Sequence, residues 1–262
     1  MIGQKIGILG GGNLGRSIAV GLVKSRKMKP ENIYISRRKD HLLDDLKKLG
    51  LKTGNDNLAL AEFSDVIILA VKPRQALEVL GAIKSKLRKE QILISVVTGI
   101  KMEQLEQAAG NKPSIYRAMP NTAIAIQESM TCIATKSGDE KKREIVFSIF
   151  DLLGRSIKIE EELMNAATVL AACGIAYALR FIRAASQGGI EIGFDSITAQ
   201  LVAAQTVKGA AGLLLEGKEH PEKEIDKVTT PMGCTIAGLN EMEHQGFSSS
   251  LIKGIITSYN KI

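Results

Sequence analysis

Lys5-Ile-Gly-Ile-Leu-Gly-Gly-Gly-Asn-Leu-Gly15 is the stretch that decides the fold of this chain. A short apolar run leads directly into Gly10-x-Gly12-x-x-Gly15 and then into a helical pattern, which is the context of a dinucleotide-binding turn. Gly10 allows the tight turn, Gly12 lets the backbone approach a pyrophosphate, and Gly15 lets the helix pack closely on the strand. The free N–H groups and the dipole of the helix N-terminus favour a bound phosphate.

The sequence that follows the glycines supports this interpretation. An apolar helical face comes next, at Ile18, Ala19, Leu22 and Val23. A second strand pattern, Asn32-Ile-Tyr-Ile-Ser36, follows at the spacing of a βαβ unit. The alternative is a glycine-rich turn without a ligand.

The end of the second strand bears on which dinucleotide is bound. An NAD site places Asp or Glu about 20 residues after the glycines to bind the ribose 2′-OH, whereas positive charge suits the 2′-phosphate of NADP. This chain has Ser36-Arg-Arg-Lys39 at that point, and its first carboxylate is Asp40. The sequence therefore predicts NADPH, with NADH possible. The alternative is a solvated basic turn before a helix that Asp40 caps.

Length and composition favour a two-domain protein of a reducing compartment. A chain of 262 residues is long enough for two cores, and three scattered cysteines form neither a disulfide framework nor a zinc-ligand spacing. We expect a cytoplasmic protein without a signal peptide, a metal site or a membrane span, because apolar stretches such as Val169–Leu179 are too short to cross a bilayer. The net charge of +7 is spread over the chain, and the sequence has no nucleic-acid recognition motif. We therefore expect no nucleic-acid partner.

Strand and helix patterns alternate in the first part of the chain and give way to helical patterns near Glu160. Further strands are predicted at 65–71, 92–97, 114–118, 130–135 and 156–159, with helices at 42–49 and 139–153. We predict an α/β Rossmann-type doubly wound domain over residues 1–159 and an all-α domain over 160–262. Ligands of such a sheet bind beyond the carboxyl ends of its strands, here Val71–Pro73, Val97–Gly99 and Met119–Thr122.

The second domain is rich in small residues. A long helix is predicted over 161–186 and another over 196–215, followed by a loop from Gly217 to Gly233 and two short helices that end near Tyr259. Alanine and glycine line both long helices, and such residues cannot fill a core alone. The pattern therefore predicts helices that pack against a second copy of the chain.

Motifs along nearly the whole chain resemble those of the pyrroline-5-carboxylate reductases. They are Gly10-x-Gly-Asn-Leu14, Ala70-Val-Lys-Pro73, Arg117-x-Met-Pro-Asn-Thr122, Ala204-Gln-Thr206, and Val228-Thr-Thr-Pro-Met-Gly-Cys-Thr-Ile-Ala-Gly-Leu239 followed by Glu243 and Gly246-Phe247. The resemblance implies reduction of the cyclic imine L-1-pyrroline-5-carboxylate to L-proline, the last step of proline synthesis, with NAD(P)H. It also implies a homodimer through the helical domain, often assembled further.

The resemblance implies roles for individual residues. Those that would bind the cofactor are Leu9, Gly10, Gly11, Gly12, Asn13 and Leu14 at the pyrophosphate, Ser36 and Arg37 at the 2′-phosphate, Asn57 at the adenine-side ribose, and Ala70, Val71, Lys72, Pro73, Val96, Val97 and Thr98 along the nicotinamide half. Gly233, Cys234 and Thr235 would bind the substrate carboxylate at a helix N-terminus, an anion site on physical grounds also. Thr235 is the candidate catalytic residue, hydrogen bonded to the ring nitrogen; the alternative is that it caps the helix.

Two segments depart from the family pattern, which reads (T/S)PGG(T/A)TIxGL and SGSGPAY at these places. Met232 stands where the family has the first loop glycine, and a side chain there strains a loop that needs positive φ. The second segment is Ala171-Ala-Cys-Gly-Ile-Ala-Tyr177, without the serines and the proline. A reductase of another cyclic imine and a non-catalytic NADP-binding protein are the alternatives. The β-hydroxyacid dehydrogenases are another alternative, because they share a Rossmann domain followed by an all-helical domain. They use a lysine on the interdomain helix as acid and base, and this chain has no lysine between Lys158 and Lys208, which disfavours that family.

Overall fold

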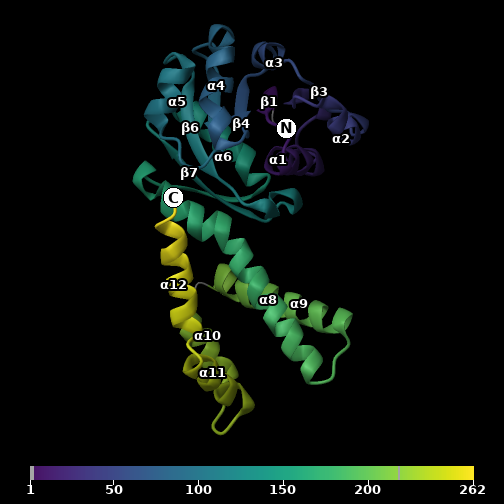
Figure 1. Ribbon diagram of the computed structural model, residues 1–262, viewed down its shortest axis with the longest axis vertical. Coiled ribbons are helices and arrows are strands. Elements are labelled where there is room, and N and C mark those ends of the chain that lie inside the picture. Colours follow the sequence, from purple (N-terminus) through teal and green to yellow (C-terminus); the bar gives the residue numbers. More distant parts are fainter. Residues whose placement is uncertain (1–2, 218) are drawn as a thin grey trace. The chain divides into compact units, whose positions relative to one another are not determined.

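The structure of the protein, a computed structural model, describes residues 3–217 and 219–262. It divides into two compact units, one formed by the chain up to Cys173 together with Ile262, and the other by Gly174–Lys261. Strands and helices build the first unit, and helices alone build the second (Figure 1). They are called the sheet unit and the helical unit below.

Eight strands of the described chain form one sheet in the order β3-β2-β1-β4-β5-β6-β7-β8. The strands are β1 (Ile6–Leu9), β2 (Ile33–Ser36), β3 (Lys52–Gly54), β4 (Val66–Leu69), β5 (Ile92–Ser95), β6 (Ser114–Met119), β7 (Ser129–Thr135) and β8 (Gly154–Lys158). Neighbours from β3 to β6 pair in parallel, β7 is antiparallel to β6, and β8 is parallel to β7. This is the order of a doubly wound dinucleotide-binding sheet with two added strands.

Helices cover both faces of the sheet. One core packs α1 (Asn13–Lys24), α2 (Asp44–Lys48) and α6 (Glu140–Asp151) on the sheet, and the other packs α3 (Asn57–Phe63), α4 (Pro73–Ile83) and α5 (Met102–Ala109). Short 3-10 turns are η1 (Pro30–Asn32), η2 (Asp40–Leu43), η3 (Lys84–Lys86) and η4 (Thr122–Ile126). Ile8 belongs to the first core and its neighbour Leu9 to the second, which explains the unbroken apolar runs of the central strands. The predicted fold class is confirmed.

Several local elements differ from the sequence prediction. The strand β3 was not predicted, because Lys52-Thr-Gly54 at the sheet edge has no apolar run to reveal it. The helix predicted over 42–49 is divided into η2 and α2. Asp40 does not cap this segment, since Lys39 holds the N-cap position and Asp40 accepts a hydrogen bond from the next amide, that of His41.

The segment after β8 belongs to the sheet unit although its sequence is helical. It comprises η5 (Glu161–Leu163), α7 (Met164–Ala167) and the π-helical turn η6 (Thr168–Cys173). Met164 is fully buried in the core that includes α4 and α5. The two units therefore divide after Cys173, whereas the composition of the chain changes near residue 160. The boundary of 159 and 160 stays a prediction.

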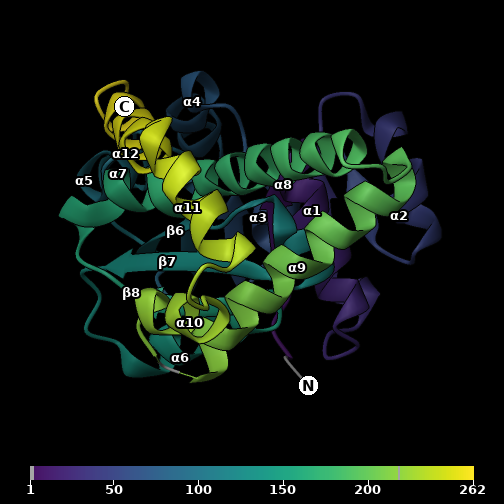
Figure 2. The same ribbon diagram turned by 90° about the horizontal axis from the view of Figure 1, so that it is seen from below.

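The helical unit begins with an antiparallel pair, α8 (Gly174–Glu191) and α9 (Ser196–Gly217), which lie side by side in Figures 1 and 2. It ends with α11 (Cys234–His244) and α12 (Phe247–Tyr259), the two predicted short helices. The Tyr177 hydroxyl lies 2.7 Å from the Ser258 Oγ, and the rings of Phe181 and Phe247 pack edge to face. These contacts hold α12 on α8.

The predicted loop from 217 to 233 contains a further helix, α10 (Pro221–Val228). Pro221 occupies its first position, where the missing N–H has no cost, and the His220 ring accepts a hydrogen bond from the Glu222 amide. Ion pairs of Lys223 with Glu219 and of Lys227 with Glu224 support it. The loop prediction was wrong for this segment because its charged residues mask a helical period.

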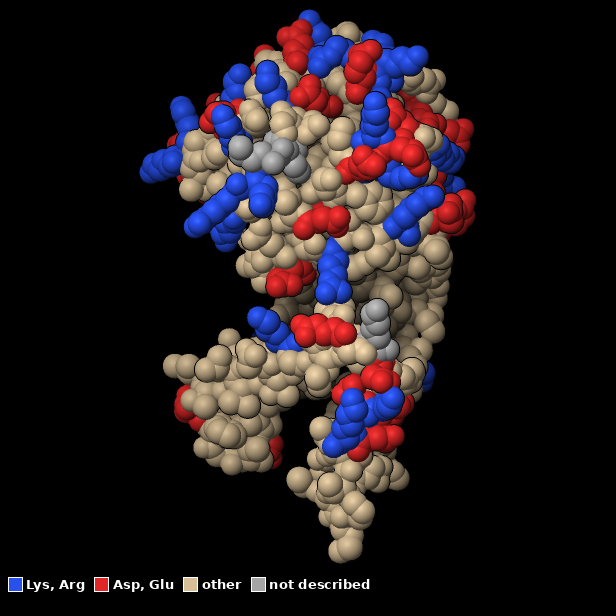
Figure 3. Space-filling view, turned by 180° about the vertical axis from the view of Figure 1, so that it is seen from behind, with Lys and Arg blue, Asp and Glu red and all other residues tan. Residues whose placement is uncertain are grey.

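The helical unit buries little of its own apolar surface. Every residue of α8 keeps exposed surface, and α9 buries only Ala199 and Ala203 among its residues. In Figure 3 most of this unit is uncharged, whereas both signs of charge mix over the sheet unit. The continuous helical stretch Glu161–Glu191 contains an 18-residue window with a mean hydropathy of 1.5. By length and composition this stretch could cross a membrane, so the expectation based on the length of apolar runs was wrong. One such helix is weak evidence for a membrane span, because core helices of other proteins share its composition.

Candidate functional site

The glycine turn joins β1 to α1 at the carboxyl edge of the sheet. Gly10 has a φ of +113°, and a Cβ on it would lie 2.5 Å from the carbonyl oxygen of Ala70. A Cβ on Gly15 would collide with the carbonyl oxygen of Gly10. Both positions therefore require glycine for the reasons that the sequence motif predicts.

Packing among the described residues does not require glycine at position 12. A Cβ at this exposed position would meet no described atom within 4 Å. Gly12 is the N-cap of α1 and has no side chain to satisfy the N–H groups of the first turn. The open surface and these N–H groups fit a phosphate that approaches the backbone closely.

The end of β2 supports the glycine turn. The carbonyl oxygen of Ser36 accepts hydrogen bonds from the amides of Gly10 at 3.1 Å and Gly11 at 2.8 Å. The Arg37 guanidinium donates to the carbonyl oxygen of Gly11 at 3.0 Å. Arg37 is thus placed beside the turn, on the side where an NAD site would carry a carboxylate.

Ser36 and Asn57 form a pair beside Arg37. The Ser36 hydroxyl donates to the Asn57 Oδ1 at 2.7 Å, and Ser36 is only 2% exposed. Asp56 caps α3 by accepting hydrogen bonds from the amides of Leu58 and Ala59, and so fixes the turn that carries Asn57. Asp56 is not among the predicted site residues, although an Asp before an apolar helical run is a recognisable N-cap.

The ends of β4 and β5 continue the same edge. The Ala70 amide donates to the Leu9 carbonyl at 2.8 Å, and the Val96 amide donates to the Leu69 carbonyl at 3.1 Å. Pro73 is the first residue of α4, as its position after Lys72 predicts. The structure thus brings together, in the sheet unit, the residues expected to bind the cofactor.

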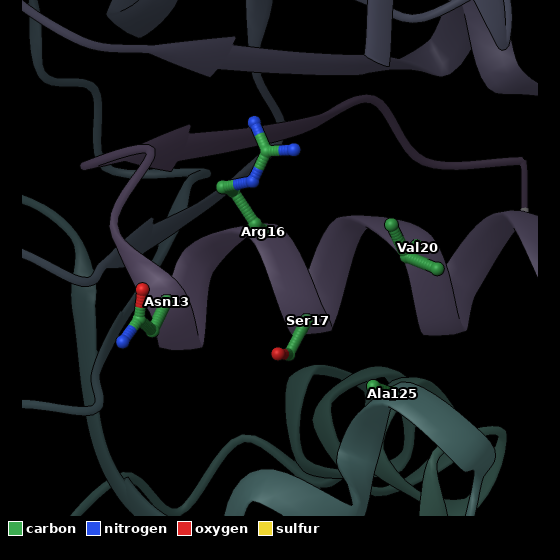
Figure 4. A pocket seen from close by; sticks show the side chains of 5 residues that line it. All are labelled: Asn13, Arg16, Ser17, Val20 and Ala125. Atoms are coloured by element: carbon green, nitrogen blue, oxygen red, sulfur yellow. The ribbon is translucent and has the colours of Figure 1, made fainter. Parts of the chain in front are cut away.

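A hollow of about 330 Å3 lies along α1 next to the glycine turn, between this helix and η4. It is lined by Asn13, Arg16, Ser17, Val20 and Ala125 (Figure 4). The Arg16 side chain points away from Ala125 and pairs with Asp45. Asn13 is the one lining residue that the sequence assigns to the cofactor site.

The residues expected to bind the substrate lie in the helical unit, at the start of α11. The Gly233 amide donates to the Thr230 carbonyl at 2.9 Å and closes a turn with Pro231 and Met232 at its centre. Met232 has a φ of +60° and its side chain is fully exposed. A turn with proline second and positive φ third normally has glycine third, so the backbone here is strained.

The N-cap of α11 is Gly233, and no side chain caps this helix. Thr235 is the second residue of the helix, so the alternative that Thr235 caps it is wrong. The first amides of α11 have no partner inside the helix, which makes them donors for an anion.

Titratable groups and cysteines add little to this site. Burial raises the pKa of the Tyr34 phenol, within β2, and the pKa of the Cys132 thiol. Cys132, Cys173 and Cys234 are all free. Over residues 3–217 and 219–262, no three His, Cys, Asp or Glu side chains form a group able to hold a metal ion.

Comparison with known proteins identifies the family. The family described as pyrroline-5-carboxylate reductase dimerisation matches residues 161–262, and the one described as NADP oxidoreductase coenzyme F420-dependent matches residues 5–99. Pyrroline-5-carboxylate reductase 2 of Dictyostelium discoideum is 45% identical, with 98% of this chain and 92% of that protein covered. Reductase 1 of the same organism is 46% identical over 98% of this chain, which spans 49% of that longer protein.

Solved structures agree with the sequence relatives. Pyrroline carboxylate reductase of Plasmodium falciparum, solved with NADP bound, has a TM-score of 0.90 at 27% identity. The match covers 100% of this chain and 97% of that chain. The pyrroline-5-carboxylate reductase of Coxiella burnetii has a TM-score of 0.89 at 30% identity, with 98% of this chain and 97% of that chain covered. Because similarity extends over both units, the chain belongs to the pyrroline-5-carboxylate reductase family.

Proposed function

We propose that this protein reduces L-1-pyrroline-5-carboxylate to L-proline with NADPH. The observation that carries the proposal is the open glycine turn with Arg37 beside it, in a chain that matches pyrroline-5-carboxylate reductases over both units. Positive charge at the end of β2 favours NADPH over NADH.

The cofactor residues divide by the part of the dinucleotide that they would bind. Leu9 to Leu14 would hold the pyrophosphate through backbone N–H groups, and Arg37 would pair with the 2′-phosphate. Asn57 would bind the adenine-side ribose. Because the Ser36 hydroxyl is buried and donates to Asn57, we assign Ser36 the role of orienting Asn57.

The nicotinamide half would lie along the ends of β4 and β5, against Ala70–Pro73 and Val96–Thr98. Val96 and Val97 are buried and present an apolar wall, whereas Thr98 is partly exposed. An apolar wall excludes water from one side of the reacting ring, which strengthens electrostatic interactions at the other.

Gly233, Cys234 and Thr235 would bind the substrate. Their amides at the start of α11 would bind the carboxylate, and the Thr235 hydroxyl would hydrogen bond the ring nitrogen. A threonine hydroxyl is too weak an acid to protonate an imine by itself, so Thr235 orients the ring rather than supplying its proton.

When bound, NADPH supplies the hydride that adds to the imine carbon. The protein contributes chiefly position and electrostatics, because the protonated imine accepts a hydride far more readily than the neutral form. Residues that fix the ring nitrogen and the carboxylate therefore determine the rate.

We further propose a homodimer, or a larger assembly of dimers, through the helical unit, and a cytoplasmic location. The match to a dimerisation family and the exposed apolar helices support the dimer. Three unpaired thiols fit a reducing compartment. Neither nucleic acid nor a membrane is a proposed partner.

One assay tests the proposed function against its alternatives. NADPH oxidation is followed with pyrroline-5-carboxylate, with its six-membered homologue and with a β-keto acid. We expect turnover with the five-membered imine at a kcat/KM at least about tenfold above the six-membered one. Preference for the six-membered ring would indicate another imine reductase, turnover of the keto acid would indicate a β-hydroxyacid dehydrogenase, and NADPH binding without turnover would indicate a regulatory protein.

A further inference from the structure

The π-helical turn η6 is the last segment of the sheet unit, and α8 begins at the residue that follows it. A π turn replaces the regular i→i+4 hydrogen bonds of an α-helix by i→i+5 bonds and so interrupts the regular ladder, frequently at a functional site. In this turn the Thr168 hydroxyl donates back to the Met164 carbonyl at 2.8 Å. The Ala171 carbonyl accepts a hydrogen bond from the Asn121 Nδ2, which lies 3.1 Å away.

Asn121 is tightly held on the sheet. It follows Pro120 at the carboxyl end of β6, and its backbone N–H donates to the Oγ of the buried Ser129 at 3.0 Å. Its Oδ1 accepts a hydrogen bond from the Ala123 amide at 3.0 Å, which caps η4. With its oxygen engaged and its backbone fixed, the carboxamide presents its nitrogen to the π turn in one orientation.

A second tether holds the beginning of the same segment. The Glu161 Oε1 accepts from the Met102 amide at 2.7 Å and from the guanidinium of the buried Arg117 at 3.1 Å. The segment 161–173 is thus fixed to the sheet at its start by Glu161 and near its end by Asn121. Of these two contacts, only that of Asn121 reaches the turn where the ladder is interrupted.

We infer that Asn121 is a positioning residue whose carboxamide holds the π turn to the end of β6 and thereby sets the start of α8. The activity part of the inference rests on the proposed function, in which both units supply residues. Asn121 lies at the carboxyl edge of the sheet, where ligands are expected, but both ends of its carboxamide are engaged by Ala171 and Ala123. A loosened turn therefore slows hydride transfer with little effect on NADPH binding.

The test replaces Asn121 in the full chain by serine. Serine keeps the cap of η4 but is too short to reach Ala171. The matched control is Gln127→Asn, at the other end of η4, which removes a carboxamide bond of 3.0 Å to the Leu152 carbonyl and does not involve the π turn. Deuterium uptake of residues 164–175, kcat, and the Kd of NADPH are measured for the unaltered protein and both variants.

We expect Asn121→Ser to speed uptake over 168–175 about tenfold and to lower kcat about ten- to a hundredfold, with the NADPH Kd changed less than about twofold. Gln127→Asn is expected to change none of the three. Unchanged uptake in Asn121→Ser, or faster uptake with an unchanged kcat, would overturn the inference. If the unaltered protein reduces no imine, the proposed function fails while uptake still decides whether Asn121 holds the turn.

If Asn121→Ser does not fold, two further measurements test the inference. Asn121→Asp retains the oxygen that caps η4 but places a carboxylate against the Ala171 carbonyl, and it is expected to reproduce the faster uptake. In the unaltered protein, residues 168–173 are expected to exchange at the rate of β6 and η4. Faster, independent exchange of this turn would show that Asn121 does not hold it.

Discussion

At the scale of single residues, contacts within the protein hold the proposed cofactor residues in place. Arg37 is an example, because its guanidinium binds the carbonyl of Gly11 and lies where a 2′-phosphate is expected. In the proposed cofactor site, its loss would remove a charge-assisted contact to the 2′-phosphate of NADPH, which NADH lacks.

Replacing Arg37 by alanine is therefore expected to raise the Kd of NADPH about ten- to a hundredfold, equivalent to about 1.5–3 kcal/mol, and that of NADH less than about threefold. Titration of each cofactor by fluorescence measures both constants. Lys39→Ala removes one positive charge from the same exposed turn and serves as the control for general electrostatics, with an expected change below twofold, about 0.4 kcal/mol. Equal losses for both cofactors in Arg37→Ala would contradict the assignment.

Thr235 tests the substrate half of the site. Thr235→Val removes the hydroxyl and keeps the shape, so kcat/KM for the imine is expected to fall about ten- to a thousandfold, or about 1.5–4 kcal/mol, while NADPH affinity stays unchanged. Thr235→Ser is expected to recover most of the activity. Because Gly233 is the N-cap of α11, melting temperatures of both variants should remain close to that of the unaltered protein. An unaltered kcat/KM in Thr235→Val would exclude the proposed role.

Met232 carries backbone strain without burying its side chain. Met232→Gly relieves a left-handed conformation that costs a non-glycine residue about 1–2 kcal/mol, and it adds about 0.5–1 kcal/mol of chain entropy to the unfolded state. The free energy of unfolding is therefore expected to stay the same or rise by up to about 1.5 kcal/mol, as measured by denaturant titration. A loss of more than about 1 kcal/mol would mean that the side chain packs against another molecule.

At the scale of elements, helix starts place the residues that we propose to bind ligands. Asp56 caps α3, whose first residue is Asn57, so Asp56→Ala should cost about 1 kcal/mol of stability and also weaken NADPH binding. Asp139 caps α6 in the same way, far along the sequence from any cofactor residue. Asp139→Ala should therefore cost a similar stability and leave the NADPH Kd unchanged. If both variants weaken NADPH equally, the effect belongs to general destabilisation.

At the scale of the whole molecule, the two units differ in how much core they bury. The sheet unit has two apolar cores, whereas the long helices of the helical unit leave Ile197 81% and Leu201 67% exposed. An apolar surface of this kind is typical of an interface between subunits. Residues 160–262 alone should accordingly not form a stable monomer.

Light scattering of the full chain is expected to show a dimer or a larger assembly, and Leu201→Glu should shift it toward the monomer and lower its melting temperature. Ile126→Glu is the matched control, since Ile126 is 65% exposed on η4 of the sheet unit. It should leave the assembly unchanged. A compact, stable monomer of the unaltered chain would contradict the proposed dimer.

The sequence by itself determined the doubly wound class and the location of the glycine turn. Local constraints carry this information, because Gly10 and Gly15 exclude any side chain and the central strands are apolar on both faces. The motif around Thr235 likewise indicated a helix start that can bind an anion. Such features depend on neighbours in sequence and can be predicted without the rest of the fold.

Only the tertiary structure decided which residues support these features from a distance. The burial of Ser36 against Asn57 and the bond from Asn121 to Ala171 each depend on segments that the fold brings together. The short edge strand β3 and the helix α10 have too few apolar residues for their period to be recognised. The π turn before α8 follows from packing of residues 161–173 on the sheet, since a regular helix would satisfy the local sequence equally well.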